Sequence, residues 1–263
     1  MPIRKKVDIG FNRKVQASWL TETLRLTAAG VAADEIETIL REQIALENQG
    51  KETIRKVFVY LNRVWIKPPG YCLALRDEAL EMFRYRPDAD SAFLLNWGMC
   101  MAAYPFIAHV AEATGRLLRL QGEAQATQVN VRIRERFGDR HFVHRSVRYN
   151  LSTFLESGAL QEGKKAGTYL RGRVMKPRDN KEIAWLVEAL LHSQDDANFP
   201  LQQIVVHGAL FPFDMTDLSL TALKESPRLD IFRHGMSETL IGLSMGEVRQ
   251  SMSLAKNHQQ QFD

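Results

Sequence analysis

Five side chains that can donate hydrogen bonds recur at helical spacing between residues 144 and 152. They are His144, Arg145, Arg148, Tyr149 and Ser152. Arginine is the commonest bidentate partner of guanine in DNA, and tyrosine or serine can hold phosphates or base edges. The alternative interpretation is a solvated helix face, which is polar in any protein. The charge of the surrounding residues favours the first interpretation.

That charge is concentrated in one segment of the chain. Residues 116–178 hold fourteen Arg and Lys residues against five Asp and Glu residues, a net charge of +9, whereas the whole chain carries only +4. Residues 179–263 hold six basic and twelve acidic residues, a net charge of −6. Positive charge gathered on one part of a protein is typical of a surface that binds a polyanion. We therefore expect residues 116–178 to bind nucleic acid.

The hydrophobic pattern predicts two helices that position these side chains. The first begins near Thr127 and ends before Gly138-Asp139-Arg140, a tight turn with Gly138 where a left-handed residue is wanted. The second helix spans 141–157. Its apolar residues share one face: Val143, Val147, Leu151, Phe154 and Leu155. The five hydrogen-bond donors lie on the opposite face.

A short hairpin follows this helix pair. The pattern predicts strands at 159–160 and 168–170, joined by the Gly-rich turn 163–167. Helix, turn, helix and basic hairpin is the order of a winged helix-turn-helix, whose second helix enters the major groove. Four residues in or after the hairpin are expected to contact phosphates rather than bases: Lys164, Lys165, Arg171 and Arg173. Each phosphate that is neutralised contributes about −0.9 to the log–log salt slope of binding.

Further candidate DNA contacts lie outside the second helix. Arg140 precedes it in the turn. Lys51 and Arg55 fall on the third helix of an N-terminal bundle, where a recognition helix could lie. For these last two residues a solvated helix face is an equally good interpretation.

The N-terminal half of the chain is predicted to be helical throughout. Three short helices between residues 15 and 65 are separated by Gly30, in a left-handed cap, and by Gly50; Lys67-Pro68-Pro69-Gly70 ends the third. Helices at 73–85, 91–103 and 105–120 follow. The Met- and aromatic-rich stretch 93–106 is interpreted as core rather than as a cofactor box. The apolar run 92–110 is interrupted by Asn96, Gly98 and Pro105, which predicts a buried helix pair.

The acidic segment 179–263 is predicted to contain a helix at 181–193, an apolar segment at 201–211 and a helix from Thr216 or Asp217 to Lys224. Two strands follow, at 228–233 and 238–241, joined at His234-Gly235. This order suggests a second, degenerate winged unit. Residues 250–263 have the composition of a polar tail.

The expected fold is thus mainly α, a helical bundle with winged helix-turn-helix domains that carry short β-hairpin wings. We expect four segments. They are a helix-turn-helix-like bundle (1–70), a helical connector (71–121), a basic winged helix-turn-helix (122–178) and an acidic C-terminal α/β domain (179–263).

Several function classes find no support in the sequence. The GxSxG, Walker A, GxGxxG and HExxH motifs are absent. His141 and His144 with Asp139 lack a further ligand at metal-binding spacing, and no cofactor or metal is expected. Cys72 and Cys100 lack a CxxC pattern and predict free thiols in a reducing compartment. We expect a cytoplasmic protein without membrane association, and not an enzyme.

The string from Gln16 to Leu160 resembles the BrxA family of BREX phage-defence accessory proteins. The resemblance rests on element order and hydrophobic pattern. It is carried by WLTETLRLTAAG, the Pro-Pro break, NWGMCMAAYPF and FLESGAL. It implies a small helical DNA-binding protein that acts beside larger methyltransferase and ATPase subunits of a defence complex. No functional residue is transferred from it.

The leading hypothesis is a non-enzymatic protein that binds double-stranded DNA. A second hypothesis is a protein–protein scaffold, in which the basic surface docks an acidic partner, or the acidic segment of a second copy in a homodimer. A third is a winged-helix transcription regulator, whose effector pocket would lie in the aromatic-rich region 93–106.

Overall fold

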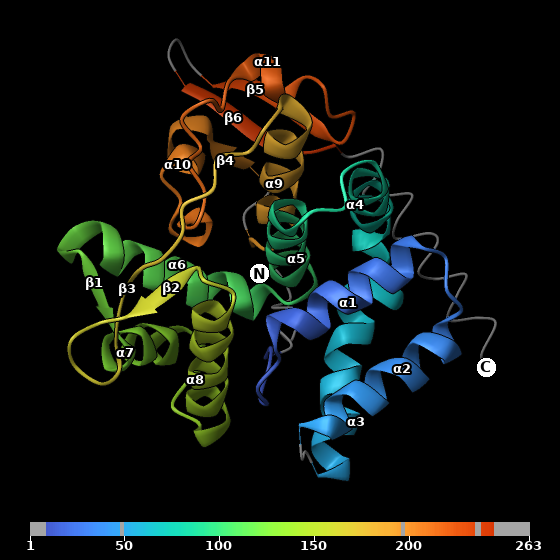
Figure 1. Cartoon of the computed structure of the whole chain (residues 1–263). Coiled ribbons are helices and arrows are strands. Elements are labelled where there is room, and N and C mark those ends of the chain that lie inside the picture. The colour runs from blue at the N-terminus through green and yellow to red at the C-terminus, as the bar shows by residue number, and fades with distance from the viewer. Residues whose placement is uncertain (1–8, 48–49, 196–197, 235–237, 245–263) are drawn as a thin grey trace.

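The computed structural model describes residues 9–47, 50–195, 198–234 and 238–244. Within these residues the protein is mainly helical, with two small three-stranded antiparallel sheets (Figure 1). The expectation of a mainly α fold is confirmed. The buried apolar side chains form one connected core that extends from Phe11 to Ile241. The predicted polar tail, 250–263, lies outside the described residues.

The N-terminal helices follow the predicted breaks. They are α1 (Ala17–Ala28), α2 (Ala33–Leu46), α3 (Lys51–Leu61) and η1, a turn of π-helix (Asn62–Ile66). Gly30 has a left-handed φ of 76°, and the amide of Val31 donates to the carbonyl of Leu26 at 3.1 Å. This is the predicted left-handed cap. The indole N–H of Trp65 donates to Oδ1 of Asn96 at 2.8 Å and so joins η1 to the centre of the molecule.

Four helices form the centre of the molecule. They are η2 (Gly70–Cys72), α4 (Leu73–Tyr85), α5 (Ala89–Ala103) and α6 (Pro105–Gln121). Every residue of α5 from Ser91 to Ala103 is buried, because neighbouring helices cover it on all sides. A helix that is apolar all round is a core helix. The predicted buried helix pair, and the interpretation of 93–106 as core, are confirmed.

Gly98 is needed where α5 crosses α9 (Asn180–His192). A Cβ on Gly98 would overlap the ring of Trp185, a side chain that is 1% exposed and donates its indole N–H to the carbonyl of Leu75 at 2.9 Å. The residue that interrupts the apolar run therefore permits the closest helix contact in this part of the core.

Among the described residues, no single helix is both long and apolar enough to cross a membrane. Only α5 and α6 taken together meet that criterion, and they are bent by 116°. The bend lies at Tyr104, before the proline that begins α6.

A first sheet follows α6. Its elements are β1 (Glu123–Gln125), α7 (Ala126–Phe137), α8 (His141–Glu156), β2 (Leu160–Glu162) and β3 (Thr168–Arg171). The two predicted helices and the hairpin are confirmed, and Gly138 has the expected positive φ, 84°. The strand β1 was not predicted. It pairs with β3, so the sheet order is β1-β3-β2. We refer to residues 105–171 as the basic unit.

The second sheet lies in residues 180–243, which we refer to as the acidic unit. After α9 its elements are β4 (Asn198–Pro200), α10 (Leu201–Val205), η3 (Gly208–Leu210), α11 (Leu220–Leu223), β5 (Leu229–His234) and β6 (Glu238–Leu243). The sheet order is β4-β6-β5. The predicted helix at 181–193 and both predicted strands are confirmed; Gly235, at their predicted junction, lies outside the described residues.

The predicted helix start at Thr216 or Asp217 is wrong. The helix α11 begins at Leu220, and the hydroxyl of Ser219 accepts the amide of Ala222 at 3.2 Å as its cap. The amide of Thr216 instead donates to Oδ1 of Asp214 at 3.0 Å in a local turn. Asp and Ser side chains compete for such local hydrogen bonds, which is why several residues could serve as the cap.

Candidate nucleic-acid interface

The helices α7 and α8 are joined by a turn that is fixed by one carboxylate. Asp139 pairs with the guanidinium of Arg134 on α7, and its Oδ1 lies 3.0 Å from Nε2 of His144 on α8. The contact with His144, followed by that with Arg134, holds the pKa of Asp139 below its usual range. His144, a predicted DNA contact, is therefore already engaged in setting the angle between the two helices.

The buried face of α8 is the predicted one. Val143, Val147, Leu151 and Phe154 are all at most 4% exposed. In the C-terminal half of the helix Thr153 is also buried, and its hydroxyl donates to the carbonyl of Val15 at 2.9 Å. The C-terminal half of α8 is therefore packed inside the molecule.

The other face of α8 keeps four predicted contact residues in reach of solvent. Arg148 is exposed, and Arg145, Tyr149 and Ser152 are half-buried. The guanidinium carbon of Arg148 lies 5.1 Å from the ring centre of Tyr149. Within the described residues, neither Arg145 nor Arg148 has an acidic partner. Arg140, at the N-cap of α8, is exposed and donates to the carbonyl of Phe137 at 3.1 Å.

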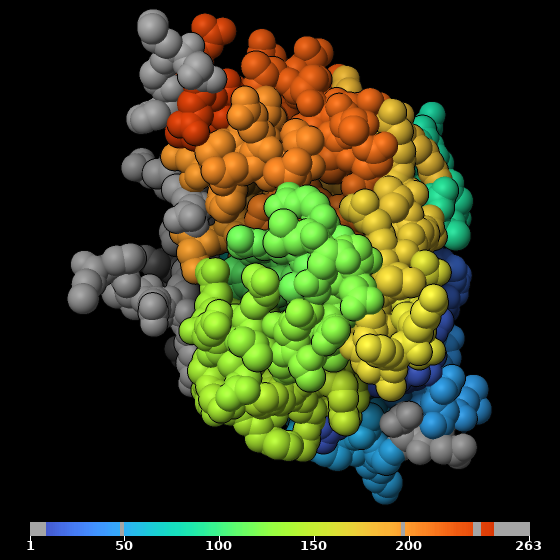
Figure 2. Space-filling model, turned by 90° about the vertical axis from the view of Figure 1, so that its left-hand side faces the viewer, coloured from blue at the N-terminus to red at the C-terminus, as the bar shows by residue number. Residues whose placement is uncertain are grey.

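The loop between β2 and β3 carries the next two predicted contacts. Lys164 and Lys165 are both exposed, and no acidic side chain of the described residues pairs with either. Figure 2 shows α6, α7, α8 and this loop as one green-to-yellow lobe on the face toward the viewer. The helix α8 and this loop thus belong to one lobe of the molecule.

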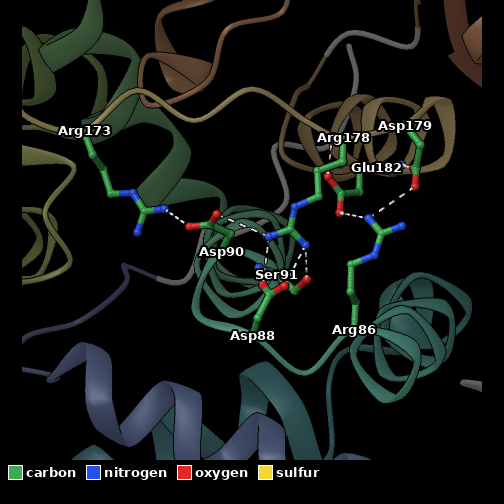
Figure 3. A network of polar contacts seen from close by, with 8 residues as sticks. All are labelled: Arg86, Asp88, Asp90, Ser91, Arg173, Arg178, Asp179 and Glu182. Carbon is green, nitrogen blue, oxygen red and sulfur yellow. Dashed lines mark hydrogen bonds and ion pairs between the residues drawn. The ribbon is translucent and has the colours of Figure 1, made fainter.

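Arg171 and Arg173 differ from the lysines, because their guanidinium groups bind other parts of the same chain. Nε of Arg171 donates to the carbonyl of Phe211 at 2.9 Å. Arg173 pairs with Asp90 at the start of α5, and its guanidinium carbon lies 4.4 Å from the ring centre of Phe93 (Figure 3). Both residues hold β3 and the chain after it against the rest of the molecule.

The same polar network holds the segment that leads into the acidic unit. Arg178 donates to both carboxylate oxygens of Asp88 at 2.9 Å and pairs with Asp90 at 3.3 Å (Figure 3). The hydrogen bonds from Arg178 and from the amide of Ser91 hold the pKa of Asp88 well below its usual range. Arg86 adds ion pairs to Asp179 and Glu182. These arginines stabilise the fold and are not free for a ligand.

The structure thus divides the fourteen bases of residues 116–178 into three classes. Six form ion pairs within the protein: Arg116, Arg134, Arg136, Arg173, Lys176 and Arg178. Three donate to backbone carbonyls: Arg119, Arg140 and Arg171. The remaining five have neither kind of partner among the described residues: Arg132, Arg145, Arg148, Lys164 and Lys165.

Arg132 is the member of this unpaired set that the sequence did not single out. It lies on α7 and is exposed. Arg134 and Arg136, on the same helix, look equivalent in the sequence but pair with Asp139 and Asp195. The distinction depends on an acid 59 residues away in the case of Arg136, so no local signal marks it.

The two candidate DNA contacts on α3 also divide into an unpaired and a paired residue. Lys51, the first residue of α3, is exposed, and no ion pair is found for it among the described residues. Arg55 forms a bidentate pair with Glu52 at 2.9 and 3.0 Å, and Lys56 pairs with the same carboxylate at 3.1 Å. These contacts lower the pKa of Glu52 to about 2. Only Lys51 is thus left with an uncompensated charge.

Comparison with protein-family models, with curated proteins and with solved structures gives no match.

The other residues that could take part in catalysis or metal binding are either buried in the core or far from one another. Cys72 and Cys100 are free and buried, and burial raises the pKa of the Cys100 thiol to about 12. Glu188, only 1% exposed at its side chain, pairs with Arg228 at 2.7 Å and with His192 at 3.6 Å. Among the described residues, no three His, Cys, Asp or Glu side chains are grouped to hold a metal ion.

Proposed function

We propose that residues 105–171 form a winged helix-turn-helix that binds double-stranded DNA. In this proposal α7 and α8 are the helix pair, α8 enters the major groove, and the β2–β3 loop is the wing. The order α6, β1, α7, α8, β2, β3, with β1 paired to β3, supports this assignment. So does the turn at Gly138, which connects two helices packed against each other.

One observation carries the proposal. The five bases of residues 116–178 that have no partner within the described chain all lie on α7, α8 or the β2–β3 loop. Six of the other nine bases are paired with acids and three donate to backbone carbonyls, so the five bases on this surface are the ones without either kind of partner in the described chain. A phosphate backbone supplies the missing counter-charge, and Arg145 and Arg148 are placed to read bases. The long side chains of Lys164 and Lys165, in the exposed β2–β3 loop, fit a contact with the phosphate backbone of the DNA.

The first test is the fluorescence anisotropy of a random duplex of about three helical turns, titrated with the full-length protein at several salt concentrations. Three neutralised phosphates, for Arg132, Lys164 and Lys165, predict a log–log salt slope of about −3. Absence of binding at low salt would refute the proposal.

The second test is the double charge reversal Arg145→Glu with Arg148→Glu. We expect duplex affinity to fall about 100-fold, because each reversal removes a base contact and adds a repulsion between the new carboxylate and the DNA. The matched control is Lys224→Glu with Arg233→Glu, two exposed bases of the acidic unit for which the described residues offer no partner. The control makes the same change in net charge, so equal losses for both variants would contradict a localised interface.

The proposal includes the wider role that the sequence resemblance implies. The protein would be a cytoplasmic, non-enzymatic accessory subunit of a BREX-like defence system and would act beside other subunits. What supports this is the residue pattern from Gln16 to Leu160. In a host that carries such a locus, the Arg145→Glu, Arg148→Glu variant is expected to reduce protection in a phage plating assay, and the Lys224→Glu, Arg233→Glu variant is not.

A protein–protein scaffold is the second candidate function. The observation that favours it is the presence of Val131 and Phe142, 50% and 40% exposed, on the same helices as the unpaired bases. Exposed apolar side chains beside charge are typical of protein interfaces. Sedimentation at low and high salt tests it: dimers that dissociate with salt, in a protein without duplex affinity, would support the scaffold over the DNA-binding function.

A further inference from the structure

A pocket of about 180 Å³ lies where α1, α5 and the end of α8 meet. Figure 1 shows these three helices converging near the centre of the molecule. Its walls are mainly apolar and include the aromatic rings of Phe93 and Trp97 from α5 and of Phe154 from α8. The rings of Trp97 and Phe154 are 4.8 Å apart. Such a lining favours a flat, apolar ligand.

The polar groups of the pocket point to a ligand that accepts a hydrogen bond. The side-chain amide of Asn96 donates to the hydroxyl oxygen of Thr21 at 3.1 Å, and Oδ1 of Asn96 is occupied by the indole of Trp65. The hydroxyl hydrogen of Thr21 has no acceptor among the described residues. Both Thr21 and Asn96 line the pocket, which therefore offers the hydroxyl hydrogen of Thr21, beside the second amide hydrogen of Asn96, as donors without an acceptor among the described residues.

The charged residues that line the pocket are balanced in pairs. Arg173 pairs with Asp90, and Glu156 pairs with Lys14 at 3.3 Å. A charged ligand would have to break one of these pairs, so the lining selects against a net charge on the ligand. The best-fitting ligand is neutral.

The volume sets the size of the ligand. An apolar protein cavity of about 150 Å³ holds one benzene molecule. The pocket is somewhat larger, and its lining includes the exposed residues Ala89 and Glu156. It can therefore hold one substituted ring or two fused rings.

We propose that this pocket binds a small, neutral aromatic molecule that accepts a hydrogen bond from Thr21, and that its occupation alters DNA binding through α8. The second part rests on the proposed function. The pocket is lined by Thr153, Phe154 and Ser157 at the C-terminal end of α8. The same helix carries Arg145 and Arg148 two to three turns away, so a ligand that shifts this end of the helix shifts its exposed face.

The direct test is calorimetric titration of the full-length protein with 2-naphthol, without DNA. We expect one site per chain with a dissociation constant below about 1 mM, an ordinary efficiency for a ligand of this size. Naphthalene, which lacks the acceptor, should bind about fivefold more weakly, the effect of one typical hydrogen bond. Absence of 2-naphthol binding would overturn the proposal.

Two variants locate the site. Ala17 lines the pocket as the first residue of α1, and Ala17→Leu should weaken 2-naphthol binding by about tenfold or more by filling the space. The matched control is Ala33→Leu, at the exposed first residue of α2, which should bind like the wild type. Thr21→Val should remove the preference for 2-naphthol over naphthalene, and Thr21→Ser should restore it. Equal binding by Ala17→Leu and wild type would place the ligand elsewhere and overturn the proposal.

The coupling is tested by duplex anisotropy with and without saturating 2-naphthol. A change of about threefold or more in duplex affinity in the wild type, absent in Ala17→Leu, is expected for a typical coupling energy. An unchanged affinity would overturn the coupling. A protein that binds 2-naphthol but no duplex at low salt would refute the proposed DNA-binding function and leave the pocket assignment in place.

Discussion

The basic unit and the acidic unit place their elements in the same order but expose different surfaces. In each, a long helix leads to a short strand, further helices and a hairpin, and the first strand pairs with the last, in the orders β1-β3-β2 and β4-β6-β5. The last helix of the basic unit, α8, has 16 residues, whereas the last helix of the acidic unit, α11, has four. The shared topology therefore does not by itself assign a shared role, because function depends on the side chains that the fold displays.

The difference arises from what each unit packs against. In the acidic unit, η3 lies on α6 so closely that a Cβ on Gly115 would overlap the carbonyl oxygen of Gly208. The indole of Trp97 donates to the carbonyl of Ala209 at 3.0 Å. The middle of this unit is thus packed against α5 and α6 and is not available to a ligand. In the basic unit one face of the N-terminal half of α8 is left uncovered, and it keeps Arg145 and Arg148 in reach of solvent.

The largest expected effect comes from breaking the contact between the units. Gly115→Ala should lower the free energy of unfolding by about 3 kcal/mol, because neither the backbone at Gly208 nor α6 can move without loss of packing. The midpoint of urea unfolding measures it. The control is Gly50→Ala, where the added methyl meets no atom within 4 Å and φ is −65°; we expect a loss below about 1 kcal/mol there. Similar losses would show that the close approach of α6 and η3 is unimportant.

A smaller effect is expected on the salt dependence of duplex binding. It distinguishes the lysines of the β2–β3 loop from lysines elsewhere on the surface. Lys164→Ala with Lys165→Ala should make the salt slope of duplex binding less steep by about 2, because two phosphate contacts are lost. The control, Lys67→Ala with Lys224→Ala, removes the same charge from exposed positions outside the basic unit. An unchanged slope for the first variant would remove the β2–β3 loop from the interface.

The variant Arg173→Ala tests whether a base that is paired within the protein contributes to DNA binding. Since its guanidinium binds Asp90 and covers Phe93, the substitution should destabilise the protein by about 1 kcal/mol and leave the salt slope unchanged. Thermal unfolding and the anisotropy titration together measure both quantities. A slope reduced by about 1 would mean that Arg173 contacts a phosphate despite its internal partners.

The smallest effect concerns Asp88, whose ion pair with Arg178 is partly exposed. Its pKa is lower in the folded than in the unfolded protein, so its ionised form stabilises the fold above about pH 4, and this contribution is lost as the pH falls through the folded-state value. Asp88→Asn should therefore flatten the decline of the unfolding temperature between about pH 4 and pH 2. Glu81→Gln, at an exposed position on α4 without a described ion pair, should leave the decline as in the wild type.

Local patterns in the sequence predicted most of the helices and the ends that glycine and proline impose. They did not predict β1 or β4, because strands of three residues carry no alternation that distinguishes them from loops. They placed Arg145 and Arg148 on an exposed face correctly. They could not show that Arg173 is paired, because its partner Asp90 lies 83 residues earlier and the pairing exists only in the folded chain.

The bond from the hydroxyl of Thr153 to the carbonyl of Val15 spans 138 residues and has a consequence for synthesis on the ribosome. The segment before α1 emerges first, yet its partner on α8 is made only after more than half of the chain. A contact of such sequence separation forms late, because the intervening chain must first be ordered. The helix α8 thus acquires this support only after residue 153 has been synthesised, and excising the basic unit would remove that support altogether.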